Sequence, residues 1–487
     1  MVISETGTGW KPKPLHIIAL LLVLQLFVTL LTDGFALSFD EAMWHYIGRD
    51  WFKHGLIPYS GGADNKSPLI FAIFGLSDQL FGVNYWFPRV LGTICESIGI
   101  YYVYKIAKHS AGENAGILAL SFYGLSLLWH TTGGKYISYT ETYSVMFFII
   151  AVYHFITAQN SRTFFISGFL AGIAFGFRLT AIFGIITLFI ASLRKGKLAI
   201  LVFGEGVLSG ILLLILAAFL AGIHLRDLFT YMLGDNFGTG SATDHNLSWK
   251  LHQLSAKFIF SGMALFYPLV LLALFKGKKI SLFVLWLILA FIGINAVGIY
   301  DNVHLKEMLP ALSILSAFAV AHLVKVYKLR FTVILLSIWI VFFPNVIEVL
   351  NNFKRVTTGN TFPIQSFCVA PYLKPDEGTL KKLGLWVCGN TAVNDKVYVA
   401  GYGAQVQAYS ERISPTIYFN VTQTTIAKAR LFSDLQKDKP AIILVPLYAE
   451  YKDNVDPDIR NFISTITAKY YTAESCIYNY QVYRLRK

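Results

Sequence analysis

Charged residues are scarce in this sequence. Only 14% of its 487 residues are charged, whereas 55% are hydrophobic. Soluble domains carry roughly 25% charged residues, so the deficit excludes an ordinary soluble fold for most of the chain. In their place the sequence has many apolar runs close to the roughly 20 residues that cross a bilayer core. We therefore expect an α-helical integral membrane protein.

Patterns that hold metals or nucleotides are also missing. None of the four cysteines forms a CxxC pair or a His/Cys spacing typical of a metal site. Gly401-Tyr402-Gly403 is too short for a dinucleotide-binding fingerprint, and no other glycine-rich phosphate loop occurs. We expect no nucleotide binding. Cys368 and Cys388 are equally consistent with a disulfide and with free thiols.

The apolar runs predict about eleven transmembrane helices. The expected spans are 15–35, 87–107, 115–131, 143–158, 163–177, 180–193, 198–222, 256–275, 280–299, 307–324 and 331–347. The short pair 163–177 and 180–193 is consistent with one broken helix or with two separate ones.

The net charge of +13 comes from basic residues that stand in short clusters between the apolar runs. Such clusters are topology signals, and they argue against a nucleic-acid partner. With eleven spans, the clusters at 11–13, 105–108, 194–197, 276–279 and 325–330 all fall on one side. The positive-inside rule then places the N-terminus in the cytoplasm and the C-terminal region outside.

Two outer segments are long. Segment 36–86 contains the apolar stretch 69–81, which is too short to span and predicts an amphipathic or re-entrant helix on the membrane surface. Segment 223–255 is rich in glycine and mixed charges, which predicts a mobile loop. Both belong to a membrane module that we expect over residues 1–349.

The C-terminal part, residues 350–487, changes in character. Its runs 396–401 and 441–446 are β-branched and bounded by turn residues, as in buried parallel strands. Residues 424–437 between them have helical spacing, and 478–485 alternate as a final strand. This pattern predicts a small extracytoplasmic α/β domain, which can cover a site or bind a substrate.

Charged residues from at least five outer segments are expected at one depth near the membrane face. They are Asp40, Glu41, Lys66, Arg89, Glu141, Arg178, His304 and Lys306. Charges near hydrocarbon are costly and usually functional, so this set predicts a polar site. For Asp40 and Glu41 alone, capping of a helix N-terminus is an equally good explanation.

Several outer motifs resemble the dolichyl-phosphate-mannose protein mannosyltransferase family and its bacterial relatives, such as the aminoarabinose transferase acting on lipid A. The motifs are Asp40-Glu41, Gly55-Leu56-Ile57-Pro58-Tyr59, Lys66-Ser67-Pro68-Leu69, Phe81-Gly82 and Arg89. The resemblance covers about 36–180 and returns at 304–311. Two positions depart from the family pattern, because Ser67 stands where the family often has proline and Glu141 where it often has aspartate. The chain also lacks the repeated soluble modules of eukaryotic members.

The resemblance implies a GT-C fold in a bacterial inner membrane, a polyprenyl-phosphate sugar donor and an acceptor hydroxyl on a lipid, glycan or protein. It also implies that Asp40 is the catalytic base. Such transfer needs positive charge on the leaving phosphate, for which Lys66, Arg89, Arg178, His304 and Lys306 are candidates.

The remaining acids and aromatic residues have expected supporting roles. Glu41 or Glu141 would orient the acceptor or the base, and a single attack would invert the anomeric centre. Tyr59, Trp44 and Trp86 are candidates for lining the acceptor or lipid path, although aromatic residues also form ordinary interfacial belts. No metal is required by this chemistry, although these carboxylates could hold a divalent cation.

Two other functions fit parts of the sequence. Transporters also carry charged residues in membrane modules, but no internal repeat is evident and the acids lie in outer loops. A polysaccharide polymerase or ligase with a diphosphate lipid donor is consistent with the composition, and only the resemblance argues against it.

Overall fold

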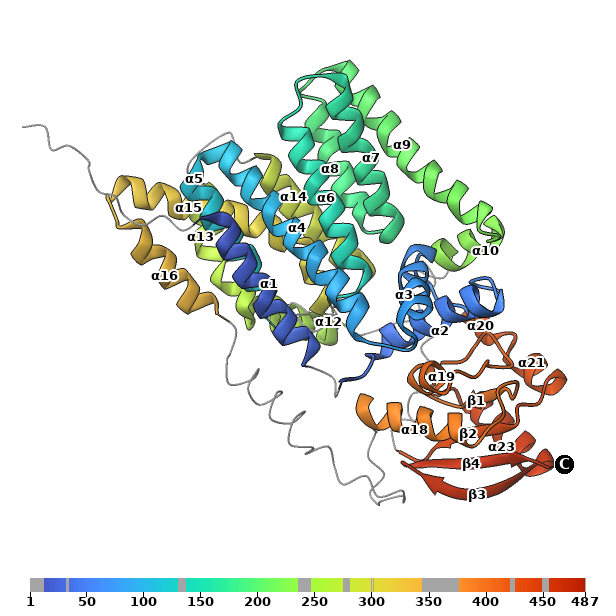
Figure 1. Cartoon of the computed structure of the whole chain (residues 1–487). Coiled ribbons are helices and arrows are strands. Elements are labelled where there is room, and N and C mark those ends of the chain that lie inside the picture. Colours follow the sequence, from blue (N-terminus) through green and yellow to red (C-terminus); the bar gives the residue numbers. More distant parts are fainter. Residues whose placement is uncertain are drawn as a thin grey trace, which may run out of the picture.

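The structure, a computed structural model, describes residues 13–31, 35–129, 137–234, 247–274, 281–298, 300, 302–343, 376–420, 425–448 and 455–486. The described chain consists of a large helical module and a smaller C-terminal domain, which lies below the helices in Figure 1. Two short helices from the first outer segment lie between these two parts.

Each apolar run contains a helix. The helices are α1 (Pro14–Leu30), α4 (Trp86–Ala111), α5 (Glu113–Ser126), α6 (Thr140–Ile156), α7 (Ser161–Phe177), α8 (Ala181–Ser192), α9 (Lys197–Leu220), α13 (Tyr267–Leu274), α14 (Ser281–Val297), α15 (Leu309–Val326) and α16 (Phe331–Phe342). The pair α7 and α8 is two separate helices, since the chain leaves the helical conformation at Arg178.

The number of spans stays a prediction. Among the described residues only Lys197–Leu220 and Leu309–Val326 are long and apolar enough to cross a membrane alone. A third candidate is the pair Leu247–Ile259 and Gly262–Leu274, which bends by 53° where we expected one helix over 256–275. A helix as short as α8 rises only about 18 Å, less than a hydrocarbon core of about 30 Å.

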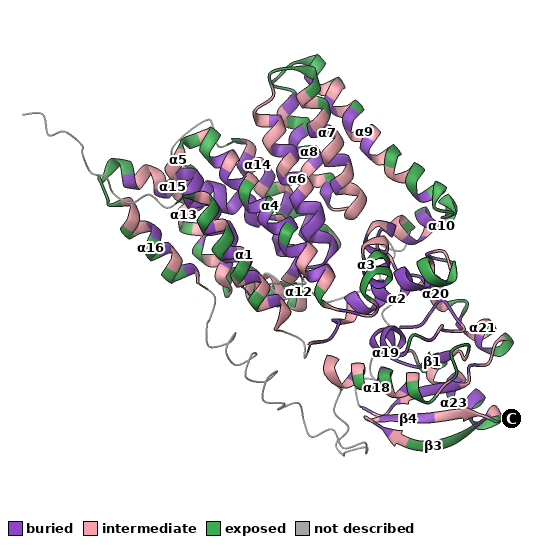
Figure 2. Ribbon diagram, viewed as in Figure 1, coloured by how far each residue is buried: buried purple, intermediate pink, exposed green. Residues whose placement is uncertain are grey.

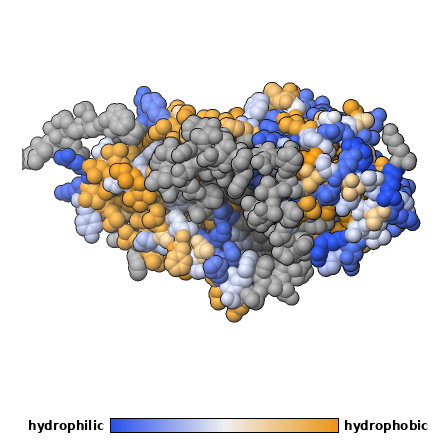
Figure 3. All heavy atoms as spheres, turned by 90° about the horizontal axis from the view of Figure 1, so that it is seen from below, coloured by the Kyte–Doolittle hydropathy of each residue, from blue (hydrophilic) through white to orange (hydrophobic). Residues whose placement is uncertain are grey.

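The helical module is apolar on the outside as well as inside. Leu198, Leu201, Leu208 and Leu220 of α9 are each more than half exposed, and exposed segments follow the outer faces of α9 and α16 in Figure 2. In Figure 3 hydrophobic side chains gather over the helical module, and hydrophilic ones over the C-terminal domain. This distribution fits a module surrounded by lipid and a domain in water.

Part of the second outer segment is helical, which corrects our expectation of a loop over 223–255. It forms α10 (Leu225–Phe229), the π-helix η3 (Thr230–Gly234), α12 (Leu247–Leu254) and the start of the π-helix η4 (Ser255–Ile259). Residues 235–246 lie outside the described part of the chain. The 3-10 helix η5 (Gly262–Leu265) then leads into α13.

The first outer segment folds into α2 (Phe39–His54) and α3 (Pro68–Phe81), so the predicted helix over 69–81 is confirmed. The two helices cross closely at a pair of glycines. A Cβ atom on Gly48 would lie 2.2 Å from the carbonyl oxygen of Phe71, and one on Gly75 would lie 2.7 Å from that of Gly48. Any larger side chain would push the helices apart, so these glycines set the position of α2.

The C-terminal domain contains a four-stranded sheet in the order β1-β2-β4-β3. Its strands are β1 (Val397–Val399), β2 (Ile442–Pro446), β3 (Tyr471–Ile477) and β4 (Tyr480–Leu485), and its helices are α18 (Glu377–Gly389), α19 (Ala404–Ser410), α20 (Thr425–Lys428), α21 (Leu431–Lys437) and α23 (Pro457–Tyr470). β1 and β2 are buried and parallel, as predicted, while β4 pairs antiparallel with β2 and β3. The sequence pattern did not indicate β3, α18 or α23.

The described residues form two hydrophobic cores. One lies among the helices of the membrane module, and the other joins α2 and α3 to the C-terminal domain. The outer segment 36–86, which we expected within the membrane module, therefore shares its core with the domain that is 290 residues further along the chain in sequence. The boundary proposed at 349/350 lies outside the described residues.

The state of the cysteines contradicts one of the two alternatives that we considered, the disulfide between Cys368 and Cys388. Cys388 carries a free thiol, whereas Cys476 is in a disulfide. A Cys368–Cys388 bridge is therefore wrong, and Cys368 itself lies outside the described residues. A disulfide in this domain is typical of an oxidising compartment.

Candidate functional site

A polar cavity of about 390 Å³ lies where the first outer segment, the membrane module and the C-terminal domain meet. Its lining comes from α2, α6, α18, η4, the 3-10 helix η7 (Asn302–Glu307) and the loops beside them. The lining residues are Ser38, Phe39, Asp40, Lys66, Tyr139, Glu141, Arg178, Lys257, Asn302, Val303, His304 and Glu377. The structure thus brings five of the predicted site residues together, namely Asp40, Lys66, Glu141, Arg178 and His304.

Asp40 lies in the first turn of α2, directly beside the cavity. The helix begins there because Ser38 and Glu41 form a capping box, in which the backbone N–H of Ser38 donates to Oε2 of Glu41 at 2.8 Å. Neighbouring side chains on a helix point about 100° apart. Asp40 therefore lines the cavity while Glu41 points into the protein.

Glu41 is held inside the protein by an ion pair and hydrogen bonds. Its carboxylate is fully buried and accepts hydrogen bonds from Nε of Arg89 at 3.0 Å and from a terminal nitrogen of Arg89 at 2.6 Å. Ser138 also donates to it. Burial alone would raise the pKa of Glu41, but the ion pair with Arg89 and these hydrogen bonds hold that pKa below its ordinary value. The capping explanation that we weighed for this residue is thus satisfied.

Arg89 does not reach the cavity. Its side chain is fully buried, and besides Glu41 it donates to the carbonyl oxygens of Thr29 at 2.9 Å and Ala36 at 3.1 Å. The guanidinium thus joins the end of α1, the start of α2 and the start of α4. The predicted contact of Arg89 with a donor phosphate finds no support in this geometry, because these hydrogen bonds point into the protein.

Lys306 is likewise directed inward. Its ammonium donates to Glu96 at 2.7 Å and to the hydroxyl of Thr142 at 3.0 Å, and its side chain is only 2% exposed. Glu96 of α4 accepts in addition from the side-chain amide of Gln25 at 2.9 Å. The predicted phosphate contact of Lys306 is replaced by an internal ion pair, whose acidic member the sequence reading missed.

Arg178 connects two acids at the cavity wall. Arg178 directly follows the last residue of α7. Its guanidinium lies 2.5 Å from Glu141 of α6 and 2.5 Å from Glu307 of η7. His304 lies 3.6 Å from the same Glu141 oxygen. The sequence indicated Arg178, Glu141 and His304 but not Glu307. Because Arg178 already balances carboxylates, a bound phosphate would share its charge with them.

Lys66 stands on the loop before α3, next to the helix-capping Ser67. Its ammonium donates to the side chain of its neighbour Asn65 at 2.7 Å. Tyr59 is buried and holds this loop, because its hydroxyl donates to the carbonyl oxygen of Lys66 at 2.7 Å. Tyr59 is thus placed behind the cavity wall, and Lys66 is presented to the cavity.

Neither of the two predicted tryptophans lines the cavity. Trp44 is fully buried, and its indole N–H donates to Asp64 at 2.9 Å while its ring contacts Tyr139, a cavity residue, edge-on at 4.9 Å. Trp86 is 39% exposed at the start of α4 and packs on Phe81 at 4.7 Å. Trp44 supports the wall from behind, and Trp86 has the position of an interfacial residue.

An apolar groove of about 270 Å³ begins beside the polar cavity. Ser67, Pro68 and Leu69 line its near end, directly after Lys66, which lines the cavity. Further along, the walls come from α7, α9, α10 and η3, with Trp51 of α2. The Lys66–Leu69 motif therefore contributes residues both to the polar cavity and to the apolar groove.

Lys257, Asn302 and Glu377 line the cavity and were not indicated by the sequence. Lys257 donates to the side chain of Asn302, which joins η4 to η7. Glu377 is the first residue of α18, so the C-terminal domain contributes directly to the cavity. Glu377 is one of many charged residues in its region of the sequence. Only the docking of the C-terminal domain shows that it lines the cavity.

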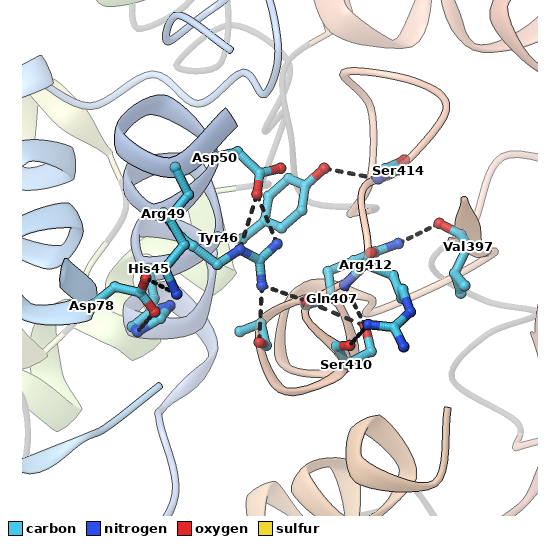
Figure 4. A network of polar contacts seen from close by, with 12 residues as sticks. His45, Tyr46, Arg49, Asp50, Asp78, Val397, Gln407, Ser410, Arg412 and Ser414 are labelled. Atoms are coloured by element: carbon cyan, nitrogen blue, oxygen red, sulfur yellow. Dashed lines mark hydrogen bonds and ion pairs between the residues drawn. The ribbon is translucent and has the colours of Figure 1, made fainter. Parts of the chain in front are cut away.

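That docking centres on α2, as Figure 4 shows. Arg49 forms an ion pair with Asp50 at 2.8 Å and donates to the carbonyl oxygens of Gln407 at 3.2 Å and Ala408 at 3.1 Å. The hydroxyl of Tyr46 accepts from the backbone N–H of Ser414 at 2.9 Å. The helix that begins with Asp40 is therefore held by the C-terminal domain one to three turns further on.

Residues 65–223 match the family described as dolichyl-phosphate-mannose-protein mannosyltransferase. No curated protein matches the sequence at a significant level.

Solved structures share the fold over nearly the whole chain. ArnT from Cupriavidus metallidurans, bound to undecaprenyl phosphate, is 13% identical with a TM-score of 0.64, covering 96% of this chain and 97% of its own. The oligosaccharyltransferase AglB from Archaeoglobus fulgidus, in complex with an inhibitory peptide and a dolichol-phosphate, is 9% identical with a TM-score of 0.53, covering 97% of this chain and 74% of its own. The family match over residues 65–223 and the shared fold confirm the resemblance seen in the motifs, and they show that the chain has a fold of the GT-C type.

Proposed function

We propose that this protein is an inverting glycosyltransferase that moves a sugar from a polyprenyl-phosphate donor to an acceptor hydroxyl at the outer face of a bacterial inner membrane. One observation carries the proposal. Asp40 shares one cavity with Lys66 and His304, and the residues that directly follow Lys66 in sequence line an apolar groove. A carboxylate, cations and an apolar groove are what an amphiphilic sugar phosphate and an acceptor alcohol require.

The reaction follows from the chemistry of these groups. The acceptor oxygen attacks the anomeric carbon while the bond from that carbon to the phosphate oxygen breaks. The bonding electrons leave with the polyprenyl phosphate, and Asp40 takes the proton of the acceptor hydroxyl. Attack opposite the leaving group inverts the anomeric centre. Of the three acids that the sequence indicated, we assign the base to Asp40, because Glu41 is buried against Arg89 and Glu141 is bound to Arg178.

Positive charge on the leaving phosphate supplies the second part of the catalysis. Lys66 and Lys257 bring ammonium groups to the cavity, and His304 adds a third basic side chain. In a site with little water, such groups stabilise developing negative charge more strongly than in solution. Arg178 acts mainly through Glu141 and Glu307, whose positions it fixes.

The apolar groove provides the place for the lipid part of the donor. Its walls run from Pro68 along α7 and α9, which pack through glycines so tightly that a Cβ on Gly168 would lie 2.0 Å from a carbonyl oxygen of α9. A polyprenyl chain lying there would keep the sugar at the cavity, and holding two reactants together lowers the barrier by several kcal/mol. The undecaprenyl phosphate bound to ArnT is consistent with such a donor.

The orientation rests on two observations. The basic clusters between the predicted spans support a cavity on the side away from the cytoplasm. The disulfide of Cys476 fits an oxidising compartment for the C-terminal domain. Lipid, glycan and protein acceptors all have the hydroxyl that the reaction needs.

The test is transfer of radiolabel from polyprenyl-phosphate sugars in membranes that contain the full chain. Wild type is compared with Asp40→Asn and with Asp458→Asn, which changes an exposed aspartate of α23 outside the cavity. We expect transfer by wild type and Asp458→Asn, and a loss of at least about a hundredfold in Asp40→Asn, in line with general-base catalysis.

Two outcomes would contradict the proposal. Turnover by Asp40→Asn at the wild-type rate would remove Asp40 as the base. Failure of the intact protein with every monophosphate donor, combined with transfer from diphosphate donors, would make it a polymerase or ligase; substrate movement without transfer would make it a transporter.

A further inference from the structure

A second cavity, of about 860 Å³, lies in the membrane module at the end opposite the polar site. It is bounded by the last turns of α4, α6, α8 and α13 and by the first turns of α14. All of these helix ends belong to the side that carries the basic clusters, so the cavity faces the cytoplasmic leaflet. The glycosyl-transfer chemistry makes no use of it.

The rim of this cavity is basic. His109, Arg194 and Lys195 line it, and all three are exposed. None of its described lining residues is acidic, and within the described ranges no carboxylate forms an ion pair with any of these three. Arg194 is held in place by donating to the hydroxyl of Ser281 at 2.9 Å, which ties the end of α8 to the start of α14.

The walls below this rim are apolar. They are formed by Phe155 and Ile156 of α6, Ile190 of α8, and Phe283 and Ile288 of α14. A basic rim above apolar walls between membrane helices matches a ligand that has an anionic head and hydrocarbon chains. A free anion would fill only the rim, and a neutral lipid would leave the charges of Arg194 and Lys195 without a counter-charge.

We propose that this cavity binds an anionic phospholipid of the cytoplasmic leaflet, with its phosphate against Arg194, Lys195 and His109 and an acyl chain along α6 and α14. The lipid would join α8 to α14, which otherwise meet at this end through the Arg194–Ser281 hydrogen bond. It would thereby stabilise the module on the face away from the polar cavity. This proposal does not depend on the transferred sugar or on Asp40.

The experiment measures the shift in thermal unfolding temperature of the full chain in a neutral detergent. The probes are phosphatidylglycerol, phosphatidylcholine of the same chain length, and inorganic phosphate. We expect a saturable rise with phosphatidylglycerol and a much smaller response to the other two. Equal responses to phosphatidylglycerol and phosphatidylcholine would overturn the proposal, and a response to phosphate alone would leave only an anion site.

Matched double variants locate the effect. Arg194→Gln/Lys195→Gln should weaken the apparent phosphatidylglycerol affinity roughly tenfold or more, given the attraction of each basic residue for anionic lipid. The control, Lys325→Gln/Arg330→Gln, removes the same charge from exposed residues of the same face that lie outside the cavity. It should change the phosphatidylglycerol affinity little. Equal weakening of phosphatidylglycerol binding in both variants would show general surface attraction and would overturn the proposed site. Arg194→Lys/Lys195→Arg keeps the charge of the rim and should retain binding.

Discussion

The carboxylate of Glu41 lies 2.6 Å from the guanidinium of Arg89, and both side chains are fully buried. The adjacent residue, Asp40, lines the polar cavity instead. Two neighbouring acids of one motif thus have different environments, which are set by the rotation of α2 about its axis. The difference separates a contribution to folding from a contribution to catalysis.

Glu41→Gln should destabilise the protein strongly. It removes the charge that balances Arg89 in a buried site, and breaking such a pair costs about 3–5 kcal/mol. We expect a marked fall in unfolding temperature and in yield. Glu474→Gln, which breaks an exposed pair with Arg484, serves as the control and should cost less than about 1 kcal/mol. A stable Glu41→Gln protein that lacks transfer activity would give Glu41 a catalytic role.

Lys66→Ala should raise the KM for the donor about ten- to a hundredfold, because a hydrogen bond to a charged phosphate contributes about 1.5–3 kcal/mol. Lys66→Arg should recover part of this, since it keeps the charge. Steady-state transfer with varied donor at saturating acceptor measures the effect, with the exposed Lys437→Ala as the control. An unchanged donor KM would show that Lys66 does not contact the phosphate.

Arg49→Ala should loosen the C-terminal domain. The change removes two hydrogen bonds to the carbonyl oxygens of Gln407 and Ala408 and leaves Asp50 buried without its partner. We expect faster hydrogen exchange in α19 and a lower transfer rate. Tyr46→Phe removes the hydroxyl that accepts from Ser414 and keeps Arg49, and it should cost about 1 kcal/mol. Unchanged exchange in Arg49→Ala would mean that the domain is held elsewhere.

Glu377→Gln should raise the KM for the acceptor several-fold and leave the KM for the donor unchanged. Glu377 is the cavity residue that the C-terminal domain supplies, and it lies apart in sequence from the Lys66–Leu69 motif beside the groove. Carboxylates commonly accept hydrogen bonds from hydroxyl groups. Initial rates with each substrate varied in turn separate the two constants. A rise in the donor KM alone would assign Glu377 to the donor.

Transfer should persist in excess EDTA. We expect the positive charge on the leaving phosphate to come from Lys66, Lys257 and His304 of the cavity. The described residues contain no group of three or more His, Cys, Asp or Glu side chains placed to hold a metal. Radiolabel transfer with and without EDTA measures the dependence. Loss of activity that Mg²⁺ or Mn²⁺ restores would assign a divalent cation to Asp40 and Glu141 instead.

The amino-acid sequence by itself determined where the helices and two of the strands lie. Apolar runs and β-branched runs are local patterns, and backbone hydrogen bonding within lipid or within a buried sheet leaves them few alternatives. Hence each expected span contains a helix, and β1 and β2 pair in parallel. The motifs from Asp40 to Arg89 likewise carry the resemblance to the mannosyltransferase family in the sequence alone.

Only the tertiary structure decided which charges face the cavity. Arg89 and Lys306 have the same sequence signal as Lys66, yet they are buried against Glu41 and Glu96. Glu377 reaches the site because α2 docks against α19, more than 300 residues away in sequence. Side-chain direction depends on helix rotation and long-range packing, and neither is encoded in local periodicity. The sequence therefore located the polar site, and the fold selected its members.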